Sequence, residues 1–228
     1  DLYPFQVETD PDLWLPYIER LKEATEIWVP SFCTTLRVRS FSGMKSHVIK
    51  ASIKPWKAEA VHGKYVVDVM RKYPDPNRHA VKEACDSLGI ECVEMGCSLS
   101  WADYQTVVAN CRFVASAYRE ASTGGLSLLE AYWLGKRVLL SNSPRNGGVD
   151  YFGSRAAYFH HENTNTLDDL RSMVKRLYEL PPREGVRVGQ LWVEEHYSDD
   201  AFAMRIANRL RGLKHAQLVR GDSAVSGG

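Results

Sequence analysis

Long apolar runs, paired cysteines and an excess of charge of one sign are all missing from this sequence of 228 residues. The longest apolar runs are far shorter than the ~20 residues that a membrane-spanning helix needs, and no signal peptide is recognisable. Basic residues number 29 and acidic residues 28, so the net charge of +1 indicates no general polyanion-binding surface. We therefore expect a cytoplasmic protein without a transmembrane segment.

Disulfide frameworks and metal centres are also poorly supported. The five cysteines are an odd number without a C-x-x-C pair, which is typical of reduced thiols in an intracellular protein. His160 and His161 suggest a metal ligand pair, but adjacent side chains on a strand point to opposite faces. We expect no metal site and no cofactor.

What the sequence does contain is enough apolar side chains for a core and one strongly patterned stretch. Hydrophobic residues make up 44% of the chain, which suits one large or two small domains. Residues 112–117 predict a buried strand, and the sequence STGG at 122–125 predicts a turn. Residues 126–133 predict a helix that ends at Gly135, and residues 138–140 predict a second strand. This crossover unit predicts an α/β fold with a doubly wound parallel sheet.

The turn before this helix is a candidate anion site. Unpaired N–H groups and the positive end of the helix dipole meet at a helix start, and glycine lets a phosphate approach closely. Glu120 and Glu130 flank the turn and can accept hydrogen bonds from sugar hydroxyls. On these local features alone, a plain tight turn with Glu130 as a solvated helix residue is an equally good interpretation.

Two segments resemble a known family. Residues 125–131 (GLSLLEA) and 135–138 (GKRV) resemble the donor-binding segment of GT-B nucleotide-sugar glycosyltransferases, especially the retaining family 4 group. Residues 26–31 (EIWVPS) resemble a strand and turn in the N-terminal domain of the same enzymes.

The resemblance implies a division of the chain. Residues 1–56 would be the end of a short or truncated N-terminal, acceptor-side domain, and residues 57–213 a Rossmann-like donor domain. We expect the last helix to end at Leu213 and residues 214–228 to form a disordered tail. The initiator Met and the first strands of the family's N-terminal domain are missing, so we expect a fragment, an unusually reduced enzyme, or a partner chain that supplies this half.

The resemblance also implies roles for single residues. Glu130 stands where the family binds the ribose hydroxyls, and Gly96 ends the strand before the loop that contacts the nucleotide base. Arg71 takes the place of the arginine that neutralises the donor pyrophosphate, and Arg78 is the candidate for its companion lysine. Backbone amides of the turn would hold the diphosphate, at Ser122, Thr123, Gly124, Gly125 and Leu126.

The residue that contacts the donor hexose is open. The position of the family's first acid is Ser122 here, and Glu120 lies two residues earlier. Either the loop is longer by two residues and Glu120 keeps the catalytic role, which we favour, or Ser122 replaces the acid.

These implications predict a hexosyltransferase that uses a nucleotide-diphosphate sugar as donor, with retention of configuration and without a metal. The acceptor is open between a glycan, a lipid-linked sugar, a protein and a nucleic-acid base. Four lysines near the predicted cleft edge are the only feature that suits a nucleic acid: Lys45, Lys50, Lys54 and Lys57.

Two other functions remain as alternatives. A non-catalytic nucleotide-sugar-binding or regulatory subunit would explain why the acceptor half is missing. An epimerase of GT-B architecture would need an acid–base set that the sequence does not show.

Overall fold

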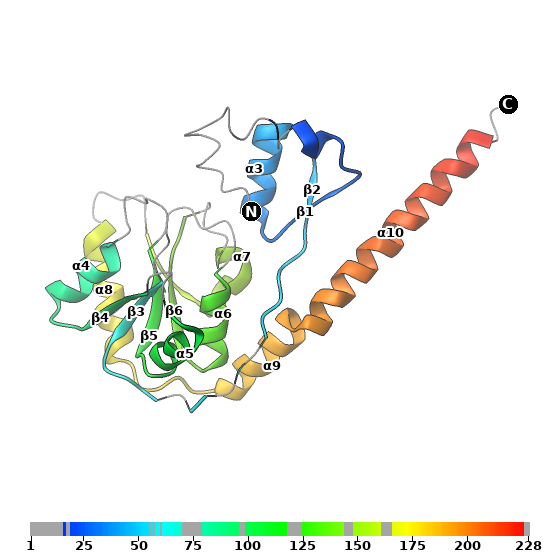
Figure 1. The fold of residues 1–228 in the computed structure, drawn as a ribbon. Coiled ribbons are helices and arrows are strands. Elements are labelled where there is room, and N and C mark those ends of the chain that lie inside the picture. Colours follow the sequence, from blue (N-terminus) through cyan, green and yellow to red (C-terminus); the bar gives the residue numbers. More distant parts are fainter. Residues whose placement is uncertain are drawn as a thin grey trace.

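The structure is a computed structural model. A parallel five-stranded sheet lies at its centre (Figure 1). The strands run in the order β4-β3-β5-β6-β7, and every neighbouring pair is parallel. They are β3 (Val66–Val69), β4 (Cys92–Met95), β5 (Phe113–Ser116), β6 (Arg137–Ser141) and β7 (Ala157–Phe159). The structure describes residues 16, 19–54, 56, 58, 59, 61–69, 79–95, 99–117, 125–143, 148–160 and 166–225.

Helices cover both faces of this sheet. On one face α4 (Ala80–Ser87) and α8 (Thr166–Glu179) bury the side chains of Val66, Phe113 and Leu139. The other face carries the next strand positions, Val67, Val114 and Leu140, which pack against three further helices. These are α5 (Trp101–Ala109), α6 (Leu126–Trp133) and α9 (Val186–Tyr197). All four residues of β5 are buried, as expected for a strand covered on both sides, and the predicted doubly wound α/β fold is confirmed.

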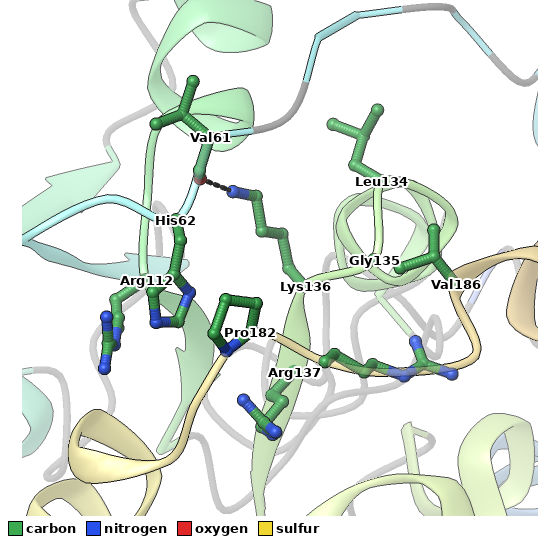
Figure 2. Close-up of a pocket in the computed structure, with 10 residues that line it drawn as sticks. Val61, His62, Arg112, Leu134, Gly135, Lys136, Arg137, Pro182 and Val186 are labelled. Carbon is green, nitrogen blue, oxygen red and sulfur yellow. Dashed lines mark hydrogen bonds between the residues drawn. The ribbon is translucent and has the colours of Figure 1, made fainter.

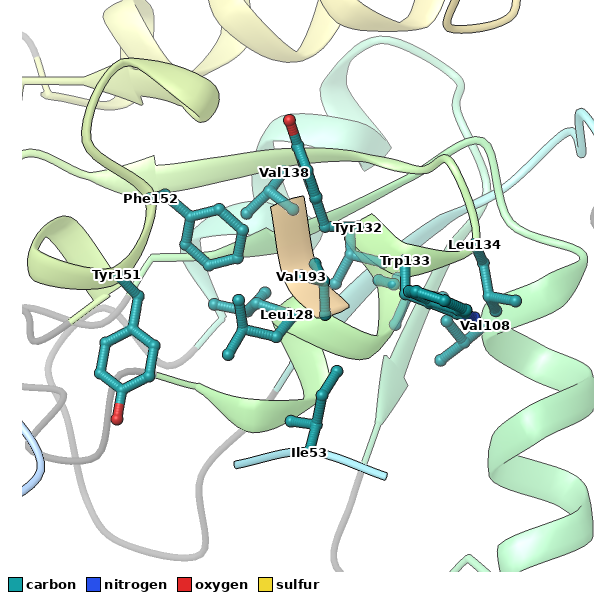
Figure 3. Packing of buried hydrophobic residues seen from close by; sticks show 14 of the residues in the cluster. Ile53, Val108, Leu128, Tyr132, Trp133, Leu134, Val138, Tyr151, Phe152 and Val193 are labelled. Atoms are coloured by element: carbon teal, nitrogen blue, oxygen red, sulfur yellow. The ribbon is translucent and has the colours of Figure 1, made fainter. Parts of the chain in front are cut away.

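The core on the α6 face joins segments that are far apart in the chain (Figure 3). Leu128 and Tyr132 of α6 lie beside Val193 of α9 and Phe152. Ile53 adds a side chain from the segment between β2 and β3. This segment therefore contributes to the core, although its described residues form no helix or strand.

The end of α6 follows the predicted geometry. Gly135 has a φ of +80°, the left-handed conformation that glycine adopts without strain. Its N–H donates to the Tyr132 carbonyl, and the Lys136 N–H donates to the Ala131 carbonyl. These two bonds satisfy carbonyls that the helix end would otherwise leave open, so the chain can turn directly into β6.

A smaller unit precedes the five-stranded sheet. Strand β1 (Ile27–Val29) pairs in parallel with β2 (Ser46–Val48), and α3 (Phe32–Ser42) connects them. The Ser31 hydroxyl accepts a hydrogen bond from the Thr34 N–H and so caps α3. The strand and turn predicted at 26–31 are thus confirmed.

The last helix is longer than predicted. Helix α10 (Asp199–Val225) continues past Leu213 and covers the first part of the segment that we expected to be disordered. The expected end at Leu213 is wrong because residues 214–220 (KHAQLVR) contain neither glycine nor proline and propagate a helix well. None of the helices in the described part of the chain is long and apolar enough to cross a membrane.

Helix α10 also returns to the N-terminal unit. Arg209 donates a hydrogen bond to the Glu26 carboxylate beside β1, and the His47 ring of β2 lies 3.1 Å from the same carboxylate. The Arg205 guanidinium donates to the Lys50 carbonyl at 2.9 Å.

A short helix that was not predicted, α7 (Gly148–Phe152), makes the second link to this unit. Its Asp150 carboxylate accepts a hydrogen bond from the Phe32 N–H at 2.7 Å, so the start of α3 is tied to the larger sheet.

Two glycines should respond in opposite directions to the same substitution. A Cβ on Gly63 would lie 1.6 Å from the backbone oxygen of Asn110, whereas a Cβ on Gly212 in α10 meets nothing within 4 Å. We expect Gly63→Ala to destabilise the protein by about 1–3 kcal/mol or more. Gly212→Ala should stabilise α10 by about 0.5–1 kcal/mol. Thermal melting followed by circular dichroism tests both, and an unchanged melting temperature for Gly63→Ala would contradict the packing described.

Candidate functional site

The order of the strands marks one end of the sheet as the place for a ligand. The chain runs from β3 outward to β4 and then returns to β5 on the other side of β3. In open parallel sheets, ligands bind beyond the carboxyl ends of the strands at the point where the order reverses. That point lies here between β3 and β5.

The predicted site residues follow these strands in the sequence. Arg71 and Arg78 come after the carboxyl end of β3, Gly96 after β4, and Glu120 after β5. All four lie outside the described residues, as do Ser122, Thr123 and Gly124. Their roles stay predictions, while the strands that precede them are confirmed as neighbours in the sheet.

Three predicted residues are described, and all three lie on or at the start of α6. Gly125 precedes the helix with a φ of +68°, and no side chain caps the helix start. A Cβ on Gly125 would lie 2.6 Å from the Leu128 Cδ1 atom, so both backbone angle and space favour glycine here. Leu126, the first helical residue, is 38% exposed. Within the described residues, the helix start therefore presents N–H donors that no side chain caps.

Glu130 lies about one turn further along α6 and is half-buried. One of its carboxylate oxygens, Oε2, accepts a hydrogen bond from the Tyr104 hydroxyl of α5. Burial raises the pKa of Glu130, and the bond from Tyr104 acts in the opposite direction. The alternative interpretation of Glu130 as a solvated helix residue does not fit this environment.

An aromatic cluster that the sequence analysis missed surrounds the Tyr104 side chain. Its ring stacks on Trp101, with centroids 5.1 Å apart and ring planes at 18°. Trp56 approaches both rings edge-on, at 6.3 Å from Tyr104 and 6.1 Å from Trp101. Trp101 is 56% exposed, so a flat aromatic face is open to solvent one residue after the predicted helix cap.

The start of α5 follows a local sequence signal, a serine with an acid three residues later. The Ser100 hydroxyl accepts a hydrogen bond from the Asp103 N–H at 3.2 Å and caps the helix. The spacing of Trp101 and Tyr104, three residues apart, places both rings on one side of this helix. That spacing was the signal for the cluster, but their proximity to Glu130 follows only from the packing of α5 against α6.

The three described lysines considered for nucleic-acid binding lie in different environments. Lys50 Nζ donates to the Asp150 carbonyl at 2.6 Å, and is thus part of the link to α7. Lys45 and Lys54 are exposed, and Lys57 lies outside the described residues. No group of His, Cys, Asp and Glu in the part of the chain that the structure describes is arranged to hold a metal ion.

A buried carboxyl on β3 was also missed. Asp68 is 2% exposed, and within the described residues its Oδ2 atom has no hydrogen-bond partner. Burial raises the pKa of Asp68 well above its usual range, with smaller contributions from Cys92 and Glu94. Asp68 faces the same side of the sheet as Val66, opposite to Glu130, so the two acids do not form a pair.

Removing the Tyr104 hydroxyl should raise the pKa of Glu130 further. In Tyr104→Phe the effect of burial stays, whereas the hydrogen bond that lowers the pKa is lost. A carbon NMR titration of the glutamate carboxyl groups measures this change. Tyr178→Phe is the matched control, because its hydroxyl donates to the Lys64 carbonyl elsewhere. An equal Glu130 titration in both variants would contradict the bond described.

Comparisons with known proteins place this geometry in context. No protein-family model matches the chain, and no curated protein sequence matches it either. Solved structures do match. Sucrose-phosphate synthase from Thermosynechococcus elongatus has a TM-score of 0.62 and 12% identity over 92% of this chain. HepE from Anabaena, solved with UDP and glucose, has a TM-score of 0.61 and 13% identity over 83%.

A third match is a variant of TarM from S. aureus, solved with fondaparinux, alpha-GlcNAc-glycerol and UDP. It has a TM-score of 0.64 and 14% identity over 84% of this chain. The chain spans 64% of the sucrose-phosphate synthase and HepE structures and 45% of the TarM structure. At these identities the likeness is one of fold. The chain therefore shares the fold of GT-B glycosyltransferases, as its sequence resemblance predicted.

Proposed function

We propose that the protein takes part in the transfer of a hexosyl group from a nucleotide-diphosphate sugar to an acceptor. The observation that carries this proposal is Glu130, which is half-buried and hydrogen-bonded to Tyr104 one turn after the glycine start of α6. A carboxylate and free helix amides so placed suit ribose hydroxyls and a diphosphate, respectively. The GT-B fold of the chain supports the same ligand class.

The proposed chemistry uses the residues that the resemblance singles out. Arg71 and Arg78, together with amides near Gly125, would stabilise the negative charge that develops on the leaving diphosphate. Glu130 would orient the ribose, and Glu120 or Ser122 would contact the transferred sugar. Retention of configuration and independence from a divalent metal are parts of this proposal that rest on the family resemblance.

A uridine nucleotide is the first donor to test, because UDP is bound in the HepE and TarM structures. We expect one of UDP-, GDP-, ADP- and TDP-glucose to raise the melting temperature without added metal. A ligand present at 100 times its dissociation constant stabilises a protein by about 2.7 kcal/mol, which a melting curve resolves. If none of the four changed the melting temperature, the proposed donor site would be wrong for this chain.

The variant Glu130→Gln tests the role of this carboxylate in donor binding. We expect it to weaken donor binding by roughly 10–100-fold, because the ribose would lose hydrogen bonds to a charged acceptor. Isothermal titration with the donor that shifts the melting curve measures the change. Glu179→Gln, an exposed glutamate at the end of α8, is the matched control and should leave binding unchanged.

The stability of Glu130→Gln relative to that of the unmodified protein should increase as the pH rises. The pKa of Glu130 is raised above its ordinary value of 4.5 by folding, so ionisation opposes folding. The contribution of the protonated Glu130 carboxyl to stability is full below pH 4.5. It is lost as the pH rises through the pKa that Glu130 has in the folded protein. Glu130→Gln lacks this loss. Its free energy of unfolding relative to the unmodified protein should therefore increase from about pH 4 to pH 7.

Arg71 provides an independent test of the diphosphate contact. We expect Arg71→Ala to lower both donor affinity and turnover, by about tenfold or more for a lost charge-assisted hydrogen bond. Arg176→Ala, which removes an exposed arginine of α8, serves as the control. Unchanged affinity and turnover in Arg71→Ala would refute the role assigned to this arginine. Slow hydrolysis of the donor by the unmodified chain alone would argue against a purely regulatory subunit.

A further inference from the structure

A pocket lies at the end of the sheet opposite to the candidate donor site (Figure 2). His62 and Arg112 come just before β3 and β5, and Lys136 and Arg137 stand at the start of β6. The pocket is therefore built at the amino ends of three parallel strands. Pro182 and Arg183 from the α8–α9 connection and Val186, the first residue of α9, close its other side.

The size of the pocket limits what it can hold. Its volume is about 190 Å³, below the ~300–1,000 Å³ that is typical of sites for drug-sized ligands. A whole nucleotide sugar does not fit such a space, whereas a small inorganic or ester-linked anion does.

Basic side chains dominate the lining. Four basic side chains line the pocket, together with the ring of His62: Arg112, Lys136, Arg137 and Arg183. Within the described residues, none of the four forms an ion pair with a carboxylate. Their mutual repulsion is visible at Arg137, whose pKa is lowered first by burial and then by the charges of Arg183 and Arg112.

Backbone carbonyls accept hydrogen bonds from all four cations, and the Arg183 guanidinium, which donates through Nη1 to the Tyr132 carbonyl at 3.4 Å, also lies over the Tyr132 ring at 3.7 Å from its centroid. Arg112 donates through Nε and Nη2 to the carbonyls of Tyr178 and Leu180, and Arg137 donates through Nη1 to that of Pro181. Lys136 Nζ donates to the carbonyls of Val61 and Cys111, with a distance of 2.8 Å to the second.

These hydrogen bonds hold the side chains in position, but they do not neutralise their positive charge. A guanidinium has five N–H donors, and the bonds to carbonyls account for two of those of Arg112 and one of those of Arg137. Carbonyl oxygens carry only partial negative charge. Several positive charges in a confined space favour a full negative charge beside them.

Two further donors point to the same conclusion. Helix α9 begins at Val186, which lines the pocket, and Gly185 before it provides no side-chain cap. The N–H groups of this helix start and the positive end of its dipole therefore lie at the pocket margin. The Nε2 atom of His62 is buried and lacks a hydrogen-bond partner in the described part of the chain.

We propose that this pocket is a second anion site, which binds a phosphate group independently of the nucleotide-sugar site. The phosphate would accept hydrogen bonds from Arg137 and Arg183, and would compensate the charge gathered at the amino ends of β3, β5 and β6. Bound there, it would join His62 of the segment between the two sheets to the α8–α9 connection.

The first experiment titrates the full chain with inorganic phosphate by calorimetry at low ionic strength. We expect Arg137→Gln and Arg183→Gln each to weaken phosphate binding by about tenfold or more. Arg211→Gln, which removes an exposed arginine of α10, should leave it unchanged. Melting curves verify that the variants are folded. If one of the two pocket variants does not fold, the other still tests the proposal.

Arg71→Gln distinguishes this pocket from the donor site. If Arg71→Gln abolished phosphate binding while Arg137→Gln and Arg183→Gln did not, the phosphate would bind at the donor site and the proposal would be overturned. Absence of phosphate binding to the unmodified chain would overturn it too. A parallel titration with glycerol 3-phosphate identifies the source of the group, because tighter binding than inorganic phosphate indicates a phosphate ester.

The pKa of His62 reports on anion binding in the pocket without any substitution. Burial lowers the pKa of His62, and the positive charges of Arg112, Lys136 and Arg137 lower it further. An anion in the pocket should therefore raise the pKa of His62. Proton NMR titration with and without sodium sulfate, whose charge is constant over this pH range, measures the change. An unchanged His62 pKa at saturating sulfate would contradict an anion beside this ring.

Discussion

The packing of α6 between the sheet and α9 is the interaction on which both proposed ligand sites depend. An isolated helix of eight residues is not stable in water, and Leu128, Leu129 and Tyr132 hold it in place through burial in the core. Its first turn carries Gly125 and its second Glu130, while its last turn leads through Gly135 into the cationic pocket. One buried helix thus sets the position of the proposed donor site and of the proposed phosphate site at opposite ends of the sheet.

Glu130 illustrates a conflict between stability and function. The apolar surroundings that hold α6 also raise the pKa of this carboxyl and make its ionised form less favourable. The Tyr104 hydroxyl offsets part of that cost, and the stacking of Tyr104 on Trp101 holds the hydroxyl in position. A carboxylate that is partly desolvated and already oriented binds hydroxyl groups more strongly than a solvated one. The stability lost by burying the acid is consistent with a role in ligand binding.

Among the described residues, polar contacts join the N-terminal unit to α10 and to α7. Glu26 bonds to Arg209 of α10, and the Phe32 N–H bonds to Asp150 of α7. The hydrogen bond from Arg209 is the largest cause that lowers the pKa of Glu26. Polar links of this kind permit relative motion more readily than a large apolar interface.

The sequence by itself determined the local elements and the class of fold. Apolar runs predicted the buried strands, Gly135 predicted the end of α6, and Ser100 predicted the start of α5, since each signal lies within a few neighbouring residues. The end of α10 was placed wrongly because a glycine-rich terminus outweighed the helix-forming residues before it. Only the tertiary structure decided which side chains meet. Tyr104 and Glu130 are 26 residues apart, and the cations of the second pocket come from three separate segments. Periodicity along the chain reports on neighbours within one helix or strand. Contacts between elements depend instead on the order of the strands and on the helices that cover each face, which no local pattern records.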